Sequence, residues 1–309
     1  MTEEELIEFD KKMTEKIEKM LKDGTYPKDK IWAGPTEPNS LIKDYVTKQK
    51  KVLKERISKL ETKPNFKIIQ VGNVEASNRY VRNKVKDCEE VGIKAEVIHL
   101  DEAISEIDLL KEMQKLNEDN SVDAYMVQFP LPGHINQKTV EHFITPLKDA
   151  DGFTNNGITN PATPQGIVTF LERRHYKFED ENALIIGRSD IVGKPMARIL
   201  LEHNCNVIQI HSKTSESQKR RLVQLADLII VATGHINTIT KDYFDPNTNN
   251  LVFLFDVGIN FDENGKLVGD CEKNLPILYQ SPVPGGVGLL TRLQLVENIL
   301  ELYEVKYGN

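Results

Sequence analysis

Cysteine is scarce in this chain, which has only three cysteines among its 309 residues. Cys88, Cys205 and Cys271 are far apart, and their number is odd. A disulfide framework needs paired cysteines, and a zinc site of the common types needs closely spaced ligands. The cysteine pattern therefore argues against both kinds of site, and we expect no bound metal.

Long apolar runs and long basic runs are also missing. The apolar runs fall short of the ~18 residues that a helix needs to span a bilayer. The net charge is -7 with no long run of Lys or Arg, whereas non-specific nucleic-acid binding depends on cationic side chains that neutralise phosphates. The acidic start Thr2–Glu5 differs from the basic and then apolar start of a secretory signal. These absences predict a soluble, cytoplasmic protein with no membrane and no nucleic-acid partner.

The Gly-x-Gly-x-x-Gly fingerprint of dinucleotide sites is absent as well, but a related pattern is present. Ala183–Ile186 is a short apolar run, typical of a strand that is covered on both faces of a parallel sheet. Gly187 ends this run, Gly193 follows six residues later, and Pro195 suits the first turn of a helix. A helix N-terminus after a glycine turn offers free N–H donors to a phosphate. The pattern fits a nucleotide site and a plain strand-to-helix turn about equally well.

Strands and helices alternate along most of the chain, after helices predicted over 2–23 and 40–60. In the first series the predicted strands are 66–71, 95–100 and 124–128, and the helices are 77–92, capped by Ser77, and 103–117. In the second series a helix over 164–174 precedes strands over 183–187, 206–211, 228–232 and 251–256, with a helix over 195–203, a hairpin turn over 262–265 and a last helix over 291–306. This order predicts two α/β domains with parallel sheets and a cleft between them.

Two polar groups in the first series are candidates for chemistry. Tyr80 and Lys84 are four residues apart, which places them on one face of a helix. A lysine held near apolar surface loses part of its preference for the charged form and can transfer protons. Gln128, at the end of a strand, could orient a polar substrate or the lysine amine. The alternative is a solvated lysine beside a half-buried tyrosine.

Two loops are further candidates, because α/β proteins bind ligands at the ends of their strands. Asp149 and Asp151 flank a small residue before Gly152, so they could bind a ring that carries N–H donors or form an ordinary Asx turn. The segment Pro282–Gly288 has three glycines in four residues, which allows close approach to a ligand or an interdomain hinge. Both alternatives stay open for each loop.

The end of the second strand of the nucleotide half distinguishes between the two nicotinamide cofactors. NAD sites usually place an acidic residue there to bind the ribose 2′-hydroxyl, whereas NADP sites use donors for the 2′-phosphate. No acidic residue occurs here before Glu216, and Arg188, Ser212, Lys213 and Thr214 are all donors. The sequence therefore favours NADP.

Taken together, the motifs resemble the bifunctional methylenetetrahydrofolate dehydrogenase/cyclohydrolase family over about residues 40–305. Five motifs in the family's order carry the resemblance: Tyr80-Val81-Arg82-Asn83-Lys84, Val127-Gln128-Phe129-Pro130-Leu131-Pro132, Lys148-Asp149-Ala150-Asp151-Gly152, Gly187-Arg188-Ser189 with Val192-Gly193-Lys194-Pro195, and Pro282-Val283-Pro284-Gly285-Gly286-Val287-Gly288. Each motif is weak alone, but five in order are specific.

The resemblance implies a two-domain α/β enzyme of one-carbon metabolism that serves purine biosynthesis. A folate-binding catalytic domain, residues 1–162 with 283–309, would carry an extra helical extension over 1–39, and a Rossmann-like domain over 163–282 would bind NADP. The enzyme would oxidise 5,10-methylenetetrahydrofolate with NADP and hydrolyse the methenyl product to 10-formyltetrahydrofolate. The family is homodimeric through the nucleotide domain, which implies a homodimer here.

The resemblance also implies roles for single residues. Lys84 would be the key residue of hydrolysis, Gln128 would tune it, Tyr80 would stack near the folate, and Asp151 would hold the pterin. The cofactor would contact Gly187, Arg188, Ser189, Ser212, Thr214 and Ile259. The substrate would also contact Val127, Phe129, Pro284, Gly285, Gly286, Val287 and Gly288.

Three departures from the family pattern leave alternatives open. Pro161-Ala162-Thr163-Pro164 replaces Pro-Cys-Thr-Pro, Leu289-Leu290 replaces Pro-Met, and the segment Phe153–Asn160 looks short. These changes keep open a dehydrogenase that has lost hydrolysis. A non-catalytic folate-binding homologue is a third possibility, against which the retained Lys84 and Gln128 argue.

Overall fold

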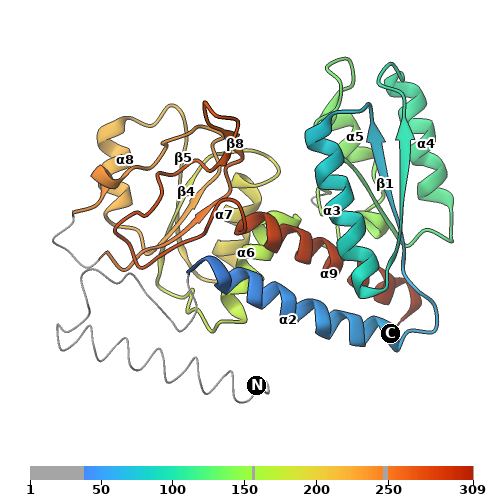
Figure 1. Cartoon of the computed structure of the whole chain (residues 1–309), viewed down its shortest axis with the longest axis horizontal. Helices are drawn as coiled ribbons and strands as arrows, with labels where there is room; N and C mark the ends of the chain where they lie inside the picture. Colours follow the sequence, from blue (N-terminus) through green and yellow to red (C-terminus); the bar gives the residue numbers. More distant parts are fainter. Residues whose placement is uncertain (1–37, 155–156, 246–249, 309) are drawn as a thin grey trace. The chain divides into compact units, whose positions relative to one another are not determined.

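The computed structural model describes residues 38–154, 157–245 and 250–308 (Figure 1). The helix predicted over 2–23 lies outside the described residues. The chain divides into two compact units. One unit comprises Ile167–Gly288 with the described residues up to Asp44, and the other comprises Tyr45–Gly166 with the residues from Leu289 onward. We call them the five-stranded unit and the three-stranded unit after their main sheets.

The three-stranded unit has a parallel sheet in the order β2-β1-β3. Its elements are β1 (Asn65–Val71), α3 (Glu75–Val91), β2 (Lys94–Leu100), α4 (Glu106–Glu118), β3 (Ala124–Val127), α5 (Gln137–Phe143) and the short η1 (Pro146–Lys148). Ile69 pairs with Val127, so the C-terminal ends of β1 and β3 lie side by side. The apolar residues Leu109 and Met113 of α4 recur at helical spacing and are fully buried against this sheet's core cluster.

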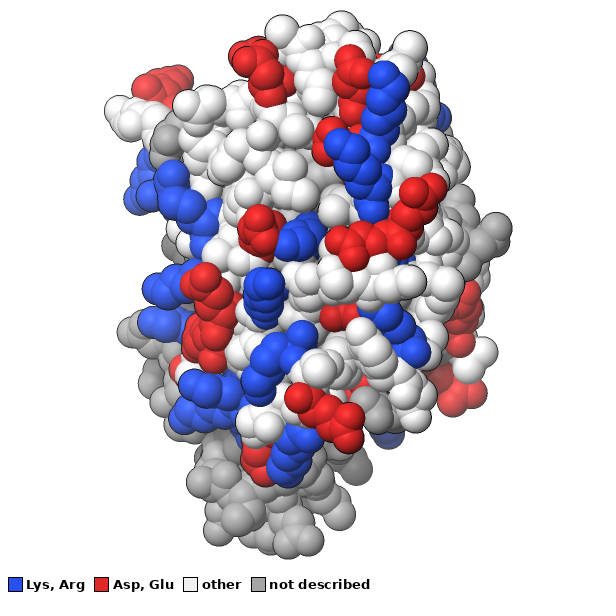
Figure 2. Space-filling view, turned by 90° about the vertical axis from the view of Figure 1, so that its right-hand side faces the viewer, with Lys and Arg blue, Asp and Glu red and all other residues white. Residues whose placement is uncertain are grey.

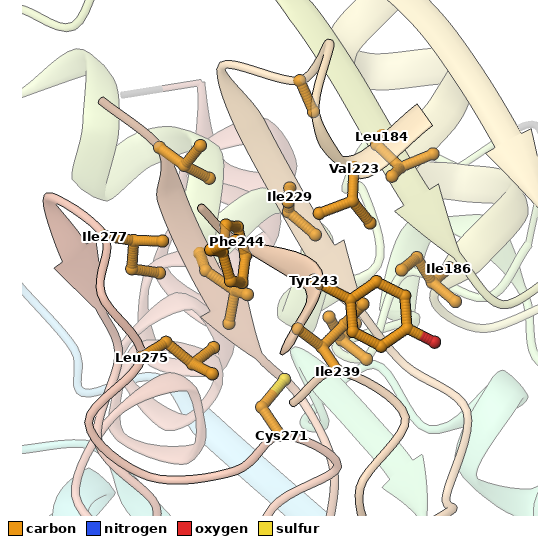
Figure 3. Close-up of a cluster of buried hydrophobic side chains, with 14 of the residues drawn as sticks. Leu184, Ile186, Val223, Ile229, Ile239, Tyr243, Phe244, Cys271, Leu275 and Ile277 are labelled. Atoms are coloured by element: carbon orange, nitrogen blue, oxygen red, sulfur yellow. The ribbon is translucent and has the colours of Figure 1, made fainter. Parts of the chain in front are cut away.

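The five-stranded unit has a parallel sheet in the order β10-β7-β6-β4-β5. Its elements are β4 (Asn182–Ile186), α7 (Gly193–Glu202), β5 (Asn206–Ile210), α8 (Glu216–Val223), β6 (Leu228–Val231), η2 (Lys241–Tyr243), β7 (Phe253–Asp256), the hairpin of β8 (Asn260–Phe261) and β9 (Leu267–Val268), and β10 (Tyr279–Gln280). Figure 3 shows the buried cluster on one face of this sheet, which includes Leu184, Ile229 and Phe244. The parallel sheets of both units confirm the predicted α/β class.

Three helices contain the boundaries between the units: α2 (Pro38–Ser58), α6 (Ala162–Glu172) and α9 (Val287–Tyr307). The last helix begins earlier than predicted, so Val287 and Gly288 belong to its first turn and not to the preceding loop. The helices α5 and α8 and the strand β10 were not predicted. Each is short, so it offers little periodicity for a sequence pattern to show.

The predicted capping role of Ser77 is wrong. The chain turns at Gly72 in the left-handed region, and Val74 is the extended residue that precedes α3. The helix therefore begins at Glu75, and Ser77 lies buried in its first turn. The predicted hairpin turn over 262–265 is confirmed, because the Gly265 N–H donates to the carbonyl of Asp262 at 2.9 Å.

Charged side chains of both signs alternate on the face of the molecule in Figure 2. Ion pairs within the described helices include Lys111 with Asp108 at 2.8 Å and Lys115 with Glu112 at 2.6 Å. None of the helices in the described part of the chain is long and apolar enough to cross a membrane.

Candidate functional site

Lys84 reaches from α3 to the end of β3 in the three-stranded unit. Its amine Nζ donates to Gln128 Oε1 at 3.2 Å and contacts Met126 Sδ at 3.3 Å. Met126 and Gln128 are two residues apart on one strand, so their side chains share a face of the sheet. Lys84 is half-buried. The predicted pair of Lys84 and Gln128 is therefore a direct contact on a rigid frame of one helix and one strand.

A second hydrogen bond fixes the amide of Gln128. Its Nε2 donates to the carbonyl oxygen of Phe129 at 2.6 Å, and its backbone N–H donates to Ile69 on β1 at 2.8 Å. The carbonyl partner accepts only, so Nε2 must face it and Oε1 must face the amine. An amine with three donor positions thus points one of them at an acceptor and keeps others for a ligand.

Tyr80 lies one helical turn before Lys84 on the same face of α3 and is half-buried. Burial raises the pKa of the Tyr80 hydroxyl, and the charges of Arg292 and Arg79 oppose this rise. Tyr80 is therefore a neutral aromatic surface beside Lys84. A flat ring of a ligand could stack on it.

The two acidic residues of the loop after η1 have different roles. The carboxylate of Asp149 is fully buried and accepts from the backbone N–H groups of Gly152 at 2.9 Å and Thr154 at 2.7 Å. Asp149 therefore forms the turn. Asp151 is also buried, and none of the described residues donates a hydrogen bond to its carboxylate. The turn alternative left open by the sequence therefore applies to Asp149, and binding of a ring by Asp151 stays a prediction.

Asp151 is electrostatically coupled to Lys84. Burial raises the pKa of the Asp151 carboxyl, and the positive charge of Lys84 lowers it in part. A buried carboxylate without a protein donor is costly, because buried acceptors are normally paired. Two unfilled oxygen atoms beside an amine suit a planar ring that offers neighbouring N–H donors.

Asn298 on α9 holds this loop in place, and no sequence pattern indicated it. Its side-chain Nδ2 donates to the carbonyl of Ala150 at 2.9 Å and to that of Asn160 at 3.1 Å. Gly152 is in the left-handed region at φ +72°, and a Cβ there would lie 2.2 Å from the Asn160 carbonyl oxygen. The backbone at position 152 therefore passes so close to the backbone at Asn160 that only glycine fits there.

Val127 and Phe129 flank Gln128 but do not join Lys84. The Val127 side chain is buried in the core cluster on the other face of the sheet, so only its backbone remains for a ligand. Phe129 packs at the edge of that core, and its ring lies 5.8 Å from the ring of Phe153. The side chains that contact Lys84 here are therefore those of Met126 and Gln128, and not those of Val127 or Phe129.

Two glycines close the turn after β4 in the five-stranded unit. Gly187 is buried with φ +131°, and a Cβ there would lie 2.2 Å from the carbonyl oxygen of Ala232. A Cβ on Gly193 would lie 2.5 Å from the Gly187 carbonyl oxygen. Ser189 Oγ accepts from the N–H groups of Val192 at 3.2 Å and Gly193 at 3.3 Å. The turn is therefore tight, and it places the N-terminus of α7 beside the strand end.

Donor side chains gather at the ends of β4 and β5, which pair in parallel. Arg188 and Lys213 are exposed, and neither forms an ion pair with another described residue. The His211 backbone N–H donates to Thr214 Oγ1 at 3.2 Å, and Lys213 N–H donates to His211 Nδ1 at 3.2 Å. These bonds fix the turn that presents Ser212. The predicted donors therefore belong to one ordered edge that suits a dinucleotide with a 2′-phosphate.

The remaining predicted residues lie on the loops of the five-stranded unit. Ile259 follows β7 and is 51% exposed. Gly285 has φ +100° with open space around it, whereas a Cβ on Gly286 would lie 2.3 Å from the Pro282 carbonyl oxygen. Pro284 is exposed. This segment therefore makes a compact glycine turn directly before α9.

The chain matches the models of two domains of one protein family. Residues 41–151 match the catalytic domain of tetrahydrofolate dehydrogenase/cyclohydrolase, and residues 161–307 match its NAD(P)-binding domain. Among curated proteins, the bifunctional protein FolD of Brevibacillus brevis is 40% identical over 247 residues, which cover 76% of this chain and 85% of that protein. The bifunctional protein FolD of Staphylococcus saprophyticus is 37% identical over 284 residues, which cover 87% of this chain and 96% of that protein.

Solved structures of similar proteins cover most of this chain. The bifunctional FolD methylenetetrahydrofolate dehydrogenase/cyclohydrolase of Campylobacter jejuni has a TM-score of 0.79 and 37% identity, covering 85% of this chain and 98% of that one. The Trypanosoma brucei enzyme, solved with NADP cofactor and inhibitor, has a TM-score of 0.79 and 26% identity, covering 86% of this chain and 97% of that one.

Proposed function

This chain belongs to the tetrahydrofolate dehydrogenase/cyclohydrolase family, and we propose that it catalyses both the dehydrogenase and the cyclohydrolase reaction. It would oxidise 5,10-methylenetetrahydrofolate with NADP and hydrolyse the resulting 5,10-methenyltetrahydrofolate to 10-formyltetrahydrofolate. The observation that carries the proposal is the contact of Lys84 Nζ with Gln128 Oε1 at 3.2 Å. The charge of Lys84 also acts on the buried carboxylate of Asp151, which accepts no hydrogen bond from the described residues.

We assign folate chemistry to the three-stranded unit and cofactor binding to the five-stranded unit. The domains would be 1–162 with 283–309, and 163–282. The breaks between the compact units, after Gly166 and after Gly288, support boundaries in these regions. For hydride transfer, the protein would need only to orient the substrate and the cofactor, and it would not need to supply acid–base catalysis.

Lys84 would handle the protons of the hydrolysis. Water adds to the methenyl carbon, and the Lys84 amine takes a proton from that water. The bond from this carbon to the ring nitrogen N5 then breaks, and Lys84 returns its proton to that nitrogen. The remaining hydroxyl proton leaves to solvent as the C=O of the formyl group forms. Gln128 Oε1 would hold the amine in position throughout, because it accepts one of its N–H donors.

Asp151 and Tyr80 would hold the pterin. The two oxygens of the Asp151 carboxylate would accept from the amino and ring N–H groups of the pterin, which would supply the donors that the described residues do not. Tyr80 lies one turn from Lys84 and would stack on the ring. We also propose that Pro284, Gly285, Gly286, Val287 and Gly288 contact the substrate.

The five-stranded unit fits NADP, because donor side chains gather at the ends of β4 and β5, which pair in parallel. When bound, NADP accepts the hydride from the methylene carbon. Gly187, Ser189 and the α7 N-terminus would contact its phosphates, and Arg188, Ser212 and Thr214 would bind the 2′-phosphate. Ile259 would contact the nicotinamide half.

Two assays on the purified chain test the proposal. We expect NADP to be reduced on addition of methylenetetrahydrofolate, faster than NAD at equal concentration. In a separate sample without cofactor, we expect methenyltetrahydrofolate to be hydrolysed. Reduction without hydrolysis would favour the alternative of a dehydrogenase alone, for which Ala162 and Leu289-Leu290 are the motivation. Activity in neither assay would overturn the proposal.

The pH dependence of substrate binding follows from Asp151. Burial raises the pKa of its carboxyl, and the ionised form is the one that accepts from the pterin. The KM for methylenetetrahydrofolate in the dehydrogenase assay should therefore rise as the pH falls through this raised pKa. Lys84→Met removes the charge that lowers the pKa of Asp151, so the rise should begin at higher pH in that variant. Identical pH profiles of KM in the two proteins would contradict this role.

We also infer a homodimer in the cytoplasm that acts on free folates. Family membership supports this inference, and light scattering of the purified chain measures the oligomer. A monomer at all concentrations would contradict it.

A further inference from the structure

Asp270 lies at the C-terminal edge of the five-stranded sheet and has no role in the account so far. The residue is fully buried between the loops that follow β6 and β7. Its carboxylate accepts from the backbone N–H groups of Thr233 at 2.6 Å and Gly234 at 2.9 Å, and from Thr233 Oγ1 at 2.9 Å. The start of the loop after β6 is therefore bound to this one side chain.

The same residue also fixes the end of that loop and part of the next one. The carbonyl oxygen of Asp270 accepts from Thr238 N–H at 2.7 Å. The other carboxylate oxygen, Oδ1, accepts at 2.8 Å from Nδ2 of Asn260, the first residue of β8, which directly follows the loop after β7. A Cβ on Gly258 would lie 2.1 Å from this oxygen, so glycine there makes room for the carboxylate. One buried aspartate thus joins two loops from neighbouring strands.

The loops joined by Asp270 carry exposed apolar side chains. Ile236 is 46% exposed and Ile259 is 51% exposed. Apolar side chains exposed beside polar backbone on the ligand edge of an α/β sheet suit a flat ring with a polar substituent. Ile259 was expected to contact the cofactor, but nothing in the sequence singled out Ile236 or Asp270.

The strand order shows which half of the cofactor these loops would meet. β4 lies between β5 and β6 in the sheet, and β7 follows β6. The donors for the 2′-phosphate are at the end of β5, and the phosphate turn is at the end of β4. A dinucleotide that crosses the edge in this direction places its nicotinamide half beyond β4, beside the loops after β6 and β7.

We propose that Asp270 is a positioning residue for the nicotinamide half of the cofactor, acting by holding the loops that carry Ile236 and Ile259. This inference rests on the proposed use of NADP. A carboxylate is required because all four side-chain contacts of Asp270 come from donors. Asp270→Asn keeps the shape but turns one acceptor into an NH₂ group, which must face an N–H or O–H donor.

The test compares two ligands that differ only in the nicotinamide group: NADP and 2′-phospho-ADP-ribose. Calorimetry on the full chain measures both dissociation constants. We expect Asp270→Asn to weaken NADP binding about tenfold, the size expected for loss of one charged hydrogen bond. Binding of 2′-phospho-ADP-ribose should change little, because its contacts lie at β4 and β5.

Asp227→Asn is the matched control. The Asp227 carboxylate also accepts two hydrogen bonds, from Asn182 N–H at 2.9 Å and Nδ2 at 3.1 Å, but at the opposite edge of the same sheet. This variant should bind both ligands as the wild type does, even if its melting temperature falls. If Asp270→Asn fails to fold, Thr233→Val, which removes one donor to Asp270, should give a smaller loss for NADP only.

Two results would overturn the proposal: unchanged NADP binding in Asp270→Asn, or equal weakening of both ligands, which would indicate general damage. Wild-type chain that binds neither ligand would instead refute the proposed function itself.

Discussion

Lys84→Met should abolish methenyltetrahydrofolate hydrolysis while NADP reduction persists. Methionine has nearly the length of lysine but cannot carry a proton, so the step that needs proton transfer loses about 10²–10⁴-fold in rate. Hydride transfer requires no proton at this position. With methylenetetrahydrofolate and NADP, the variant should therefore accumulate the methenyl compound, measured by its absorbance.

Lys86→Met is the control for this substitution. Lys86 is an exposed residue on the same helix, two positions away and thus on another face. Both activities should survive in that variant. Equal losses of the two activities in Lys84→Met would mean that Lys84 binds substrate or stabilises the fold, and that its proton is not used.

Gly187→Ala should have the opposite effect: NADP binding should weaken, whereas hydrolysis should continue. A Cβ at this position would lie 2.2 Å from the Ala232 carbonyl oxygen, and the backbone is at φ +131°. The turn must open to admit the methyl group, which moves the α7 N-terminus and the loop beyond Ala232 together. We expect NADP affinity to fall by about tenfold or more, given ~1–3 kcal/mol of backbone strain before the clash is counted.

Hydrolysis without cofactor should continue in Gly187→Ala, because the groups proposed for it lie in the three-stranded unit. The control is Gly265→Ala, which has φ +71° but nothing within 4 Å of the added Cβ. Gly265→Ala therefore introduces the strain of an alanine at positive φ without a steric clash. It should leave the affinity for NADP unchanged. Ser189→Ala, which loses the acceptor for two turn N–H groups, should weaken NADP binding less. If Gly187→Ala binds NADP normally, the phosphate site is elsewhere.

Local patterns were sufficient to predict the parts of the fold that depend on local physics. Apolar runs such as Leu184–Ile186 predicted central strands, because a strand covered on both faces needs apolar residues throughout. The spacing of Tyr80 and Lys84 correctly placed both on one face of α3. The sequence left open whether Gln128 orients a substrate or the lysine amine, and the structure places its Oε1 3.2 Å from Lys84 Nζ.

Tertiary contacts account for what the sequence did not predict. Asn298 and Asp270 bind segments far away in the chain, and an isolated Asn or Asp has no local pattern that marks such a role. Ser77 has the composition of a helix cap, but the start of α3 was set by the turn at Gly72. The two acidic residues Asp149 and Asp151 are alike in sequence, and only the loop geometry assigns the turn to one and the free carboxylate to the other.

A single time course on the wild-type chain tests whether one chain carries both the dehydrogenase and the cyclohydrolase activity. Methylenetetrahydrofolate and NADP are mixed with the enzyme, and the absorbances of NADPH and of the methenyl compound are followed together. We expect NADPH to accumulate while the methenyl signal stays low, because the hydrolysis proposed for Lys84 would consume each product as it forms. A methenyl signal that rises in proportion to NADPH and persists would contradict the claim that one chain carries both activities.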